Sequence, residues 1–354
     1  MHIHLSGADF VNIEQLFDTM AECGVTHTAI QALGYRSVSQ DLVALYWKQA
    51  KTRLNIAAFG SMHLTDMYHD VPFEVMLEHQ LKMGFDGLKL IDMCPDVRIA
   101  TGLGADNARY DRMFSMCEER GTPIVMHAAD PSSCWEKPNG TYSHERFMTK
   151  SAHFGEVYRM LAKHPKLNIC FAHFFFMSDN YDEAVRVMET YPNVYFDLTP
   201  GSSMYVDFSH DIEKWHDFFV KYSTRIMFGT DSGPRKNFNR ELNSLVYTAL
   251  THDSTEFDLP CYRCDTVRGL YLEGEPLDNI LYNNYERFLH KSAPSAPFDK
   301  AVFINACERV MYDLERCDHS FYRSFFDEIP IMKDDPDEMI AYNFCKEAIK
   351  RVDQ

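Results

Sequence analysis

The sequence lacks the features of a membrane-embedded or exported protein. It contains no run of about 18 apolar residues, the length that a membrane-spanning helix requires. No basic stretch followed by an apolar core opens the chain, so the N-terminus does not predict a signal peptide. Ten cysteines in 354 residues are too sparse for a disulfide scaffold, and without an export signal they indicate reduced thiols. We therefore expect a cytoplasmic protein with no membrane partner.

The sequence is also short of positive charge. Its 35 lysines and arginines stand against 52 aspartates and glutamates, which gives a formal net charge of -17. This charge disfavours binding to nucleic acid or to an anionic membrane surface. It leaves the charge of a small-molecule substrate open, because a local basic pocket can lie within an acidic protein.

The sequence does contain short apolar segments of β type that alternate with longer amphipathic segments, which is the pattern of βα units. Eight strands are expected, at His2–Ser6, Thr26–Leu33, Asn55–His63, Gly87–Met93, Pro123–Ala129, Asn168–His173, Val194–Thr199 and Ile226–Ser232. Eight such units in about 290 residues predict a (β/α)8 TIM barrel, whose active site lies at the C-terminal ends of the strands. An open doubly wound sheet is the alternative, but no Gly-x-Gly-x-x-Gly motif follows the first strand.

Helices are expected between the strands and again near the end of the chain. Those of the barrel include Val11–Cys23, Val38–Lys51, Phe73–Met83, Ala108–Arg120, Gly155–Lys163 and Tyr181–Thr190. After residue 290, Pro294 and Pro297 precede two further expected helices, Ala301–Cys317 and Met339–Arg351. We therefore predict a barrel over residues 1–290 and a helical C-terminal extension over 291–354. The extension would pack on the barrel or on a second subunit of a homo-oligomer.

Four of the expected strands carry side chains that bind metal ions. His2 and His4 lie two residues apart on the first strand, and side chains at this spacing point to the same face. His127 ends the fifth strand, His173 ends the sixth, and Asp231 follows Gly-Thr in the eighth. In a TIM barrel these ends converge on one mouth. Three or four histidines with one aspartate predict one divalent ion, Zn²⁺ first, with Mn²⁺ or Co²⁺ also suited.

This ordered set of residues, together with the segment Asn279–Leu289, resembles the amidohydrolase superfamily. More narrowly, the chain is similar to the amidohydrolase family 2 branch, which includes metal-dependent decarboxylases of the aminocarboxymuconate-semialdehyde type. The resemblance covers the whole expected barrel. The metal ligands that it implies are His2, His4, His127 and Asp231. It also implies that His173 lies beside a metal-bound water without being a ligand.

Two features depart from the pattern of that family. Its members usually carry several residues before the first histidine, whereas Met1 directly precedes His2 in this chain. Either the true start lies upstream of Met1, or the barrel accepts a very short first strand. The C-terminal extension has no counterpart in the family pattern.

Lys89 lies among apolar residues within the expected strand Gly87–Met93. A lysine in such a place needs a partner or a shifted pKa. In other amidohydrolase branches, a lysine on this strand is carboxylated and bridges two metal ions. In this branch, it more often contacts the substrate or a carboxylate. We expect substrate or ion-pair contact for Lys89, with metal bridging and a purely structural role as the alternatives.

Other residues beside the expected mouth are candidates for substrate binding. Trp135 and Tyr142 belong to the long loop after the fifth strand, where they would stack on a planar substrate or anchor the loop. Arg98 and Arg235 follow the fourth and eighth strands, where they would clamp a carboxylate or form surface ion pairs. His63 ends the third strand and faces the same mouth.

The expected centre suits several reactions. Beside a divalent ion, Asp231 would take a proton from water and later deliver it, while His173 would orient the water or stabilise negative charge. We expect hydrolysis of an amide, lactone or ester, because hydrolysis asks least of the surrounding residues. Non-oxidative decarboxylation of a small unsaturated or aromatic carboxylate and hydration of a carbon–carbon double bond are alternatives. A catalytically silent, metal-stabilised scaffold is another, although it would not need Asp231 as a base.

Overall fold

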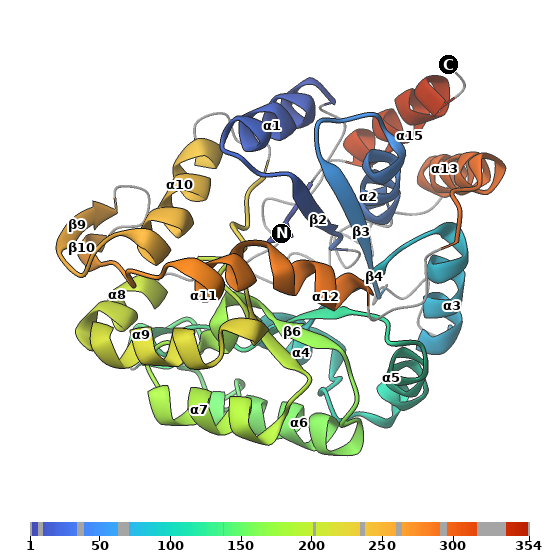
Figure 1. Ribbon diagram of the computed structural model, residues 1–354. Helices are drawn as coiled ribbons and strands as arrows, with labels where there is room; N and C mark the ends of the chain where they lie inside the picture. Colours follow the sequence, from blue (N-terminus) through green and yellow to red (C-terminus); the bar gives the residue numbers. More distant parts are fainter. Residues whose placement is uncertain are drawn as a thin grey trace.

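The computed structural model describes most of the chain, and Figure 1 shows a curved sheet surrounded by helices. The described residues are 2–5, 10–33, 39–62, 71–136, 138–200, 203–233, 238–259, 264–290, 296–316 and 338–352. Within this part of the chain, no helix is both long enough and apolar enough to cross a membrane.

Eight parallel strands form one sheet in the order of the sequence, from β1 to β8. The strands are β1 (His2–Ile3), β2 (His27–Gln31), β3 (Asn55–Ser61), β4 (Gly87–Met93), β5 (Ile124–Ala128), β6 (Ile169–Phe171), β7 (Val194–Asp197) and β8 (Ile226–Met227). Each strand therefore lies inside the segment that the sequence predicts for it, and the (β/α)8 fold is confirmed. Several strands are shorter than expected, and β6 ends two residues before His173.

The sheet closes on itself where the chain begins. A parallel bridge joins Ile3 to Ser232, which lies beyond the end of β8. Two backbone hydrogen bonds hold this seam. The N–H of His4 donates to the carbonyl of Ser232 at 3.0 Å, and the N–H of Asp231 donates to the carbonyl of His2 at 2.9 Å. The seam therefore brings His2, His4 and Asp231 together, although His4 and Asp231 are 227 positions apart in the sequence (231 minus 4).

Helices follow the strands and cover the outside of the barrel (Figure 1). They are α1 (Phe10–Glu22), α2 (Ser39–Gln49), α3 (Phe73–Met83), α4 (Pro95–Thr101), α5 (Ala108–Arg120), α6 (Lys150–Lys163), α7 (Tyr181–Thr190), α8 (Met204–His210), α9 (Ile212–Lys221), α10 (Phe238–Thr251), α11 (Gly274–Asp278) and α12 (Asn284–His290). Local sequence sets the ends of α5. The Asn107 side chain accepts a hydrogen bond from the N–H of Arg109 at its start, and Gly121 takes a left-handed φ of 70° at its end.

Among the described residues, short 3-10 and π-helical turns also lie between the elements of the barrel. They are the 3-10 turns η2 (Ser132–Trp135), η3 (Ala172–Phe176) and η4 (Ser223–Arg225) and the π-helical turn η5 (Asn279–Asn283). After α10, the chain forms an antiparallel hairpin of β9 (Glu256–Leu259) and β10 (Cys264–Arg268). The alternation of βα units does not predict this hairpin.

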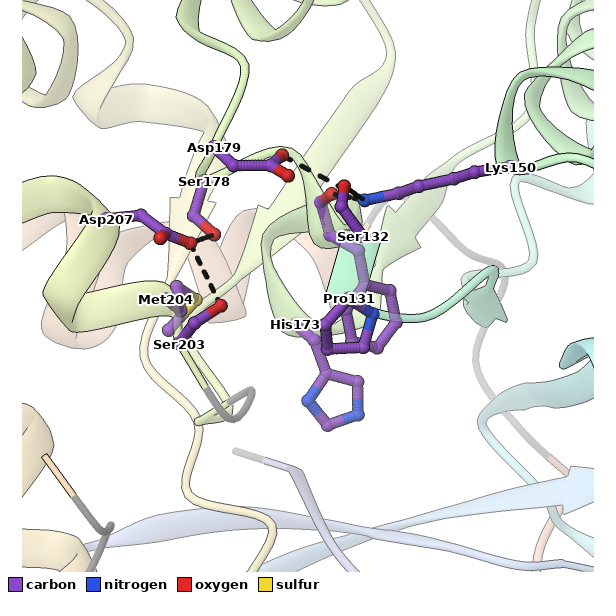
Figure 2. Close-up of a pocket in the computed structure, with 10 residues that line it drawn as sticks. Pro131, Ser132, Lys150, His173, Ser178, Asp179, Ser203, Met204 and Asp207 are labelled. Atoms are coloured by element: carbon purple, nitrogen blue, oxygen red, sulfur yellow. Dashed lines mark hydrogen bonds and ion pairs between the residues drawn. The ribbon is translucent and has the colours of Figure 1, made fainter. Parts of the chain in front are cut away.

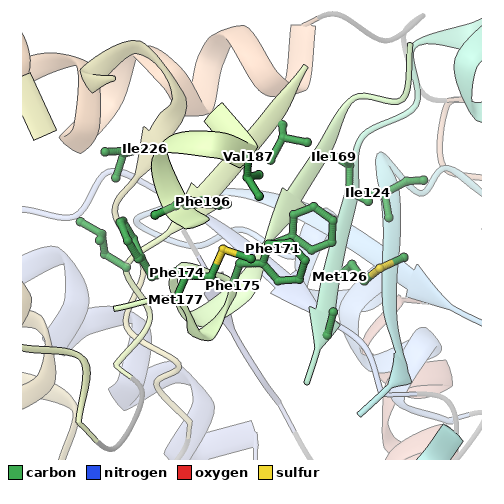
Figure 3. Close-up of a cluster of buried hydrophobic side chains, with 14 of the residues drawn as sticks. Ile124, Met126, Ile169, Phe171, Phe174, Phe175, Met177, Val187, Phe196 and Ile226 are labelled. Atoms are coloured by element: carbon green, nitrogen blue, oxygen red, sulfur yellow. The ribbon is translucent and has the colours of Figure 1, made fainter. Parts of the chain in front are cut away.

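The two faces of the strands form separate apolar clusters, as alternating side chains require. One cluster lies between strands and helices and includes Ile124, Met126, Ile169, Phe171, Phe196 and Ile226 (Figure 3). The other occupies the inner face and consists of Ala29, Ala57, Phe59, Val125, Cys170, Tyr195, Met227, Tyr285 and Phe288. Gly87 makes room for it, because a Cβ there would lie 2.6 Å from the Phe59 ring.

The inner face turns polar near the C-terminal ends of the strands. Two residues beyond Val125 and Tyr195 on the same face lie His127 and Asp197. Lys89 shares this face, because it pairs in register with Val125 of β5. Apolar packing therefore fills the barrel below, and titratable side chains converge at its mouth above.

The C-terminal helices α13 (Lys300–Arg316) and α15 (Glu338–Val352) lie beside α2 in Figure 1. They contribute Phe303, Cys307, Phe344, Cys345 and Ala348 to an apolar cluster shared with α1 and α2. The rings of Phe10 and Phe344 stack with centroids 5.5 Å apart. These helices therefore pack on the outside of the first barrel helices. The division of the chain at residue 290 and the homo-oligomer stay predictions.

Candidate metal centre

His2 and His4 present their ring nitrogens to one point. The Nδ1 atoms of both rings face oxygen acceptors: His2 Nδ1 lies 2.8 Å from Asp197 Oδ2, and His4 Nδ1 lies 2.7 Å from the carbonyl of Gln31. Both Nδ1 atoms therefore carry the proton, because those oxygens can only accept. The Nε2 atoms, left with their lone pairs, lie 3.0 Å apart. This is the arrangement of two imidazoles that share a metal ion.

Asp231 completes a group of three ligand atoms. Its Oδ1 lies 3.3 Å from His4 Nε2 and 4.0 Å from His2 Nε2. The seam of the barrel fixes its backbone, which takes a φ of 54°. The side chain of His2 is completely buried, while those of His4 and Asp231 are 24% and 34% exposed. The group is therefore open to solvent on one side, as a catalytic metal site requires.

Asp197 ends β7 and supports the centre through hydrogen bonds with His2 and His173. Besides accepting from His2, its carboxylate accepts a hydrogen bond from the backbone N–H of His173 at 2.9 Å and another from the Thr199 hydroxyl. Burial opposes its ionisation, yet the contacts with His2 and His173 hold the pKa of Asp197 below its ordinary value. Sequence reasoning did not single out this residue. Its signal is the one that marks the candidate ligands: an apolar strand that ends on a metal-binding type of side chain.

Lys89 lies beside the same two imidazoles. Its Nζ is 3.1 Å from His2 Nε2, and the residue is almost completely buried. Burial lowers the pKa of Lys89 to about 8, against the opposing effect of Asp197 and Asp231. Burial and the neighbouring Lys89 lower the pKa of His2 to about 4, so His2 is neutral and able to bind a metal ion.

His173 occupies an unusual turn directly after β6. The residues from His173 to Phe176 all have positive φ values, between 50° and 56°. Each such non-glycine residue costs about 1–2 kcal/mol, and strain of this kind concentrates at functional sites. Its Nδ1 donates to the carbonyl of Thr199 at 3.1 Å, which leaves Nε2 as an acceptor. Burial and the nearby His127 lower the pKa of His173 to about 4, so its ring is neutral.

His127 and His2 both lie near the ring of His173. The ring centroids of His127 and His173 are 5.1 Å apart, and those of His2 and His173 are 6.0 Å apart. His127 Nε2 belongs to a second group of nearby ligand atoms, with Cys94 and Asp130, the Oδ1 of Asp130 being 3.4 Å away. This Nε2 is buried and has no hydrogen-bond partner among the described residues. Its role as a metal ligand stays a prediction.

The predicted substrate-binding residues are engaged with other parts of the protein. Arg98 makes two hydrogen bonds to the carboxylate of Glu156, the shorter being 2.6 Å. The indole of Trp135 donates to the carbonyl of Met148 at 2.8 Å. The hydroxyl of Tyr142 donates to Asp130 at 2.7 Å. His63 and Arg235 lie outside the described residues.

A polar pocket adjoins the centre on the side of His173. Figure 2 shows Lys150 and Ser132 on one side of it, Asp207 and Ser203 on the other, and His173 at its base. Sequence reasoning did not find Lys150 because this residue opens a helix, where a lysine is ordinarily a surface residue. Its position beside the mouth depends on how α6 packs on the barrel.

The side chains of the centre fit a divalent metal ion. Two imidazole nitrogens and one carboxylate oxygen lie within 4.8 Å of one another. The Nδ1 of each ring is held by an oxygen acceptor, which is the usual support of a metal-binding histidine. His2, His4 and Asp231 could therefore hold the ion.

The chain belongs to the amidohydrolase family, because the family model described as Amidohydrolase matches residues 14–259. Members of this family are enzymes that commonly bind divalent metal ions. The matched range begins after His2 and His4, so the evidence for those two residues is the geometry of the centre. A search of curated proteins finds no match to the chain.

Solved structures share the fold at low sequence identity. One is an uncharacterised TIM-barrel protein, Bb4693 from Bordetella bronchiseptica, with 18% identity, a TM-score of 0.53, and coverage of 81% of this chain and 86% of that one. Another is a 4-oxalomesaconate hydratase from Rhodopseudomonas palustris, with 13% identity, a TM-score of 0.51, and coverage of 86% and 85%. Identities this low show the shared barrel alone.

Proposed function

We propose that this protein is a metal-dependent hydrolase that acts on an amide, lactone or ester of a small molecule. The observation that supports this most is the convergence of His2 Nε2, His4 Nε2 and Asp231 Oδ1 on one partly open point. A closed structural site would bury all of its ligands, whereas Asp231 is 34% exposed.

His2, His4, Asp231 and, by our proposal, His127 would hold one divalent ion, with Zn²⁺ the expected metal. The ion would supply Lewis acidity and lower the pKa of water at the site. Asp197 would keep His2 in the tautomer that leaves Nε2 unprotonated, through the 2.8 Å contact with Nδ1. In this proposal, His2 is therefore already in its metal-binding tautomer before any substrate binds.

Asp231 would act as the general base and then as the general acid. Its carboxylate is next to the imidazole nitrogens and also reaches solvent, so it can accept a proton from attacking water. It would return that proton to the leaving group of the amide, lactone or ester. The hydrogen bond to His2 fixes its backbone and keeps this carboxylate at the mouth.

His173 would orient the attacking water. Because its Nδ1 donates to Thr199, its Nε2 can only accept a hydrogen bond, and water is the ligand that donates one. The buried ring stays neutral, so it would accept from water without competing with Asp231 for the proton. The strained turn that begins at His173 sets the direction of this ring.

The predicted carboxylate clamp by Arg98 bears on the choice between hydrolysis and decarboxylation. A decarboxylase must hold the carboxylate of its substrate, which usually needs an arginine fork. Arg98 already gives its fork to Glu156. This contact favours hydrolysis of a substrate that needs no such clamp.

The test is turnover of a substrate panel by metal-loaded protein. The panel contains lactones, amides, esters, and aromatic and unsaturated carboxylates, with acid release and carbon dioxide release measured in parallel. We expect hydrolysis of at least one neutral carbonyl compound. Carbon dioxide release from a carboxylate, with no hydrolysis anywhere in the panel, would refute the proposal.

A further inference from the structure

The pocket beside His173 has a defined hydrogen-bonding capacity. On one wall, Lys150 Nζ donates to Ser132 Oγ at 2.9 Å and to the carbonyl of Phe176 at 2.7 Å. An ammonium group has three N–H donors, so one remains, and Asp179 Oδ1 lies 3.9 Å from Nζ as an ion-pair partner. Ser132 accepts from Lys150, which leaves its own hydroxyl proton for a ligand. This wall therefore offers two donors.

The opposite wall offers acceptors. Asp207 Oδ2 accepts hydrogen bonds from the hydroxyls of Ser178 at 2.6 Å and Ser203 at 3.1 Å. Both hydroxyls use the same oxygen, so Oδ1 of Asp207 takes no hydrogen bond from the described residues. The oxygens of Ser178 and Ser203 keep lone pairs, because their protons point to Asp207. Figure 2 shows these side chains across the pocket from Lys150.

The charges of the pocket do not favour an anionic ligand. Lys150 supplies one positive charge, and Asp179 and Asp207 supply two negative charges. A ligand carboxylate can only accept hydrogen bonds and would meet the free acceptor of Asp207. An ammonium ligand would meet Lys150. A hydroxyl both donates and accepts, so several hydroxyls on one molecule satisfy both walls without changing the charge.

We infer that this pocket is a subsite for a neutral, hydroxyl-rich part of the substrate, held between Lys150 with Ser132 and Asp207. The inference rests on the proposed hydrolase function, because His173 lies at the base of the pocket and orients the water in that function. The apolar side chains of Phe176 and Met204 line the same pocket and would cover the carbon skeleton. The substrate class is therefore a polyhydroxylated lactone, ester or amide.

Two variants test the subsite, each with a matched control. Lys150→Met and Asp207→Asn each remove a charged group that faces the ligand. The control for Lys150→Met is Lys163→Met. Lys163 lies on the same helix as Lys150, and its exposed side chain pairs with Asp111. The control for Asp207→Asn is Asp182→Asn, which alters a carboxylate that is 96% exposed. Thermal unfolding and metal content of all four proteins identify any variant whose fold or metal site is lost.

The kinetic probes are ribonolactone and γ-butyrolactone, which share a lactone ring and differ in hydroxyl groups. We expect wild type to prefer ribonolactone in kcat/KM. The two variants should raise KM for ribonolactone about 10-fold or more, the effect of losing hydrogen bonds to charged groups. Both controls should keep the wild-type KM. Wild type that hydrolyses both lactones equally, with variants like their controls, would overturn the subsite and leave the hydrolase proposal standing.

Binding without turnover separates the two proposals. Saturation-transfer NMR with xylitol and with phthalate reports ligand contact without hydrolysis, because neither compound contains an amide, lactone or ester bond. Stronger transfer to xylitol, reduced in Lys150→Met and Asp207→Asn, supports the subsite even if no member of the hydrolase panel reacts. Stronger transfer to phthalate, or xylitol transfer unchanged in both variants, would overturn it.

Discussion

Asp197 Oδ2 accepts a hydrogen bond from His2 Nδ1 at 2.8 Å, and both side chains are completely buried. The contact joins β7 to β1 across the inside of the barrel. It leaves His2 Nε2 unprotonated and directed at the other ligand atoms, 3.0 Å from His4 Nε2. A residue outside the candidate metal-binding group thus sets the tautomer of His2, one of its members.

Asp197→Asn should weaken metal binding without removing a ligand. The amide keeps the size of the side chain but loses the negative charge that holds the proton on His2 Nδ1. Loss of such a supporting group lowers metal affinity about 10- to 100-fold. Competition of the protein with a chromogenic Zn²⁺ chelator measures the change. Asp182→Asn, on an exposed carboxylate, is the control. Equal affinities in both variants would contradict the role given to Asp197.

Asp231→Asn should reduce turnover by about 100-fold or more, the lower range for losing a positioned acid–base group. The amide can still reach the metal ion but cannot accept a proton from water. His173→Asn should also lower turnover, while most of the metal stays bound, because His173 is assigned to the water. Steady-state kinetics and metal analysis of the same samples separate the two roles. Full activity in Asp231→Asn would rule out this residue as the base.

Lys89 should carry an unmodified amine. A carbamate would have to bridge two ions about 3.5 Å apart. Among the described residues, the ligand group next to Lys89 consists of His2, His4 and Asp231, which suits one ion. Carbon-13 NMR of protein prepared in labelled bicarbonate should show no carbamate signal. A carbamate signal together with two ions per chain would establish bridging instead.

Asp92 should make the stability of the protein depend on pH. It is buried within β4 and accepts a hydrogen bond from the hydroxyl of Tyr110 at 2.9 Å. Burial raises the pKa of Asp92 from 3.8 to about 7. The folded protein therefore holds this proton more tightly than the unfolded chain. The stability that this proton contributes is present at low pH and falls as the pH rises from about 4 to about 7.

Asp92→Asn removes this titration, because an amide stays neutral. The loss of melting temperature between about pH 5 and about pH 8 should be smaller in Asp92→Asn than in wild type. Circular dichroism melts at both pH values measure the difference. Asp182→Asn should keep the wild-type pH dependence, since its carboxylate is exposed. A pH dependence identical in Asp92→Asn and wild type would show that Asp92 is ionised in the folded protein.

The fold was readable from the sequence because its periodicities are local. The strand β4 and the helices α3, α5 and α7 begin and end at the residues that the patterns predict. The end of β6 was not readable. The expected strand runs to His173, but β6 ends at Phe171, and none of the residues from His173 to Phe176 is of a type that favours the positive φ values of the turn. Contacts with Asp197, at the end of β7, and Thr199, just beyond it, hold this turn.

The part of the candidate site that depends on one short motif was predictable from the sequence. The part that depends on contacts between residues far apart in the sequence was not. The spacing of His2 and His4 already places both rings on one face, and the barrel brings Asp231 to them. Arg98 forms a hydrogen bond with Glu156, 58 residues away, and no local sequence pattern predicts that pair. Gly229 is another residue whose role the sequence does not predict. A Cβ there would lie 2.7 Å from the Thr199 side chain, a restriction that only the folded barrel reveals.

The most direct test of the central claim is removal and return of the metal ion. Protein as purified should contain close to one divalent ion per chain and hydrolyse a neutral carbonyl substrate. Dialysis against a chelator should abolish hydrolysis while the circular dichroism spectrum stays native, and added Zn²⁺ should restore it. Hydrolysis that continues unchanged in metal-free, folded protein would contradict the account, because His2, His4 and Asp231 would then have no ion to hold.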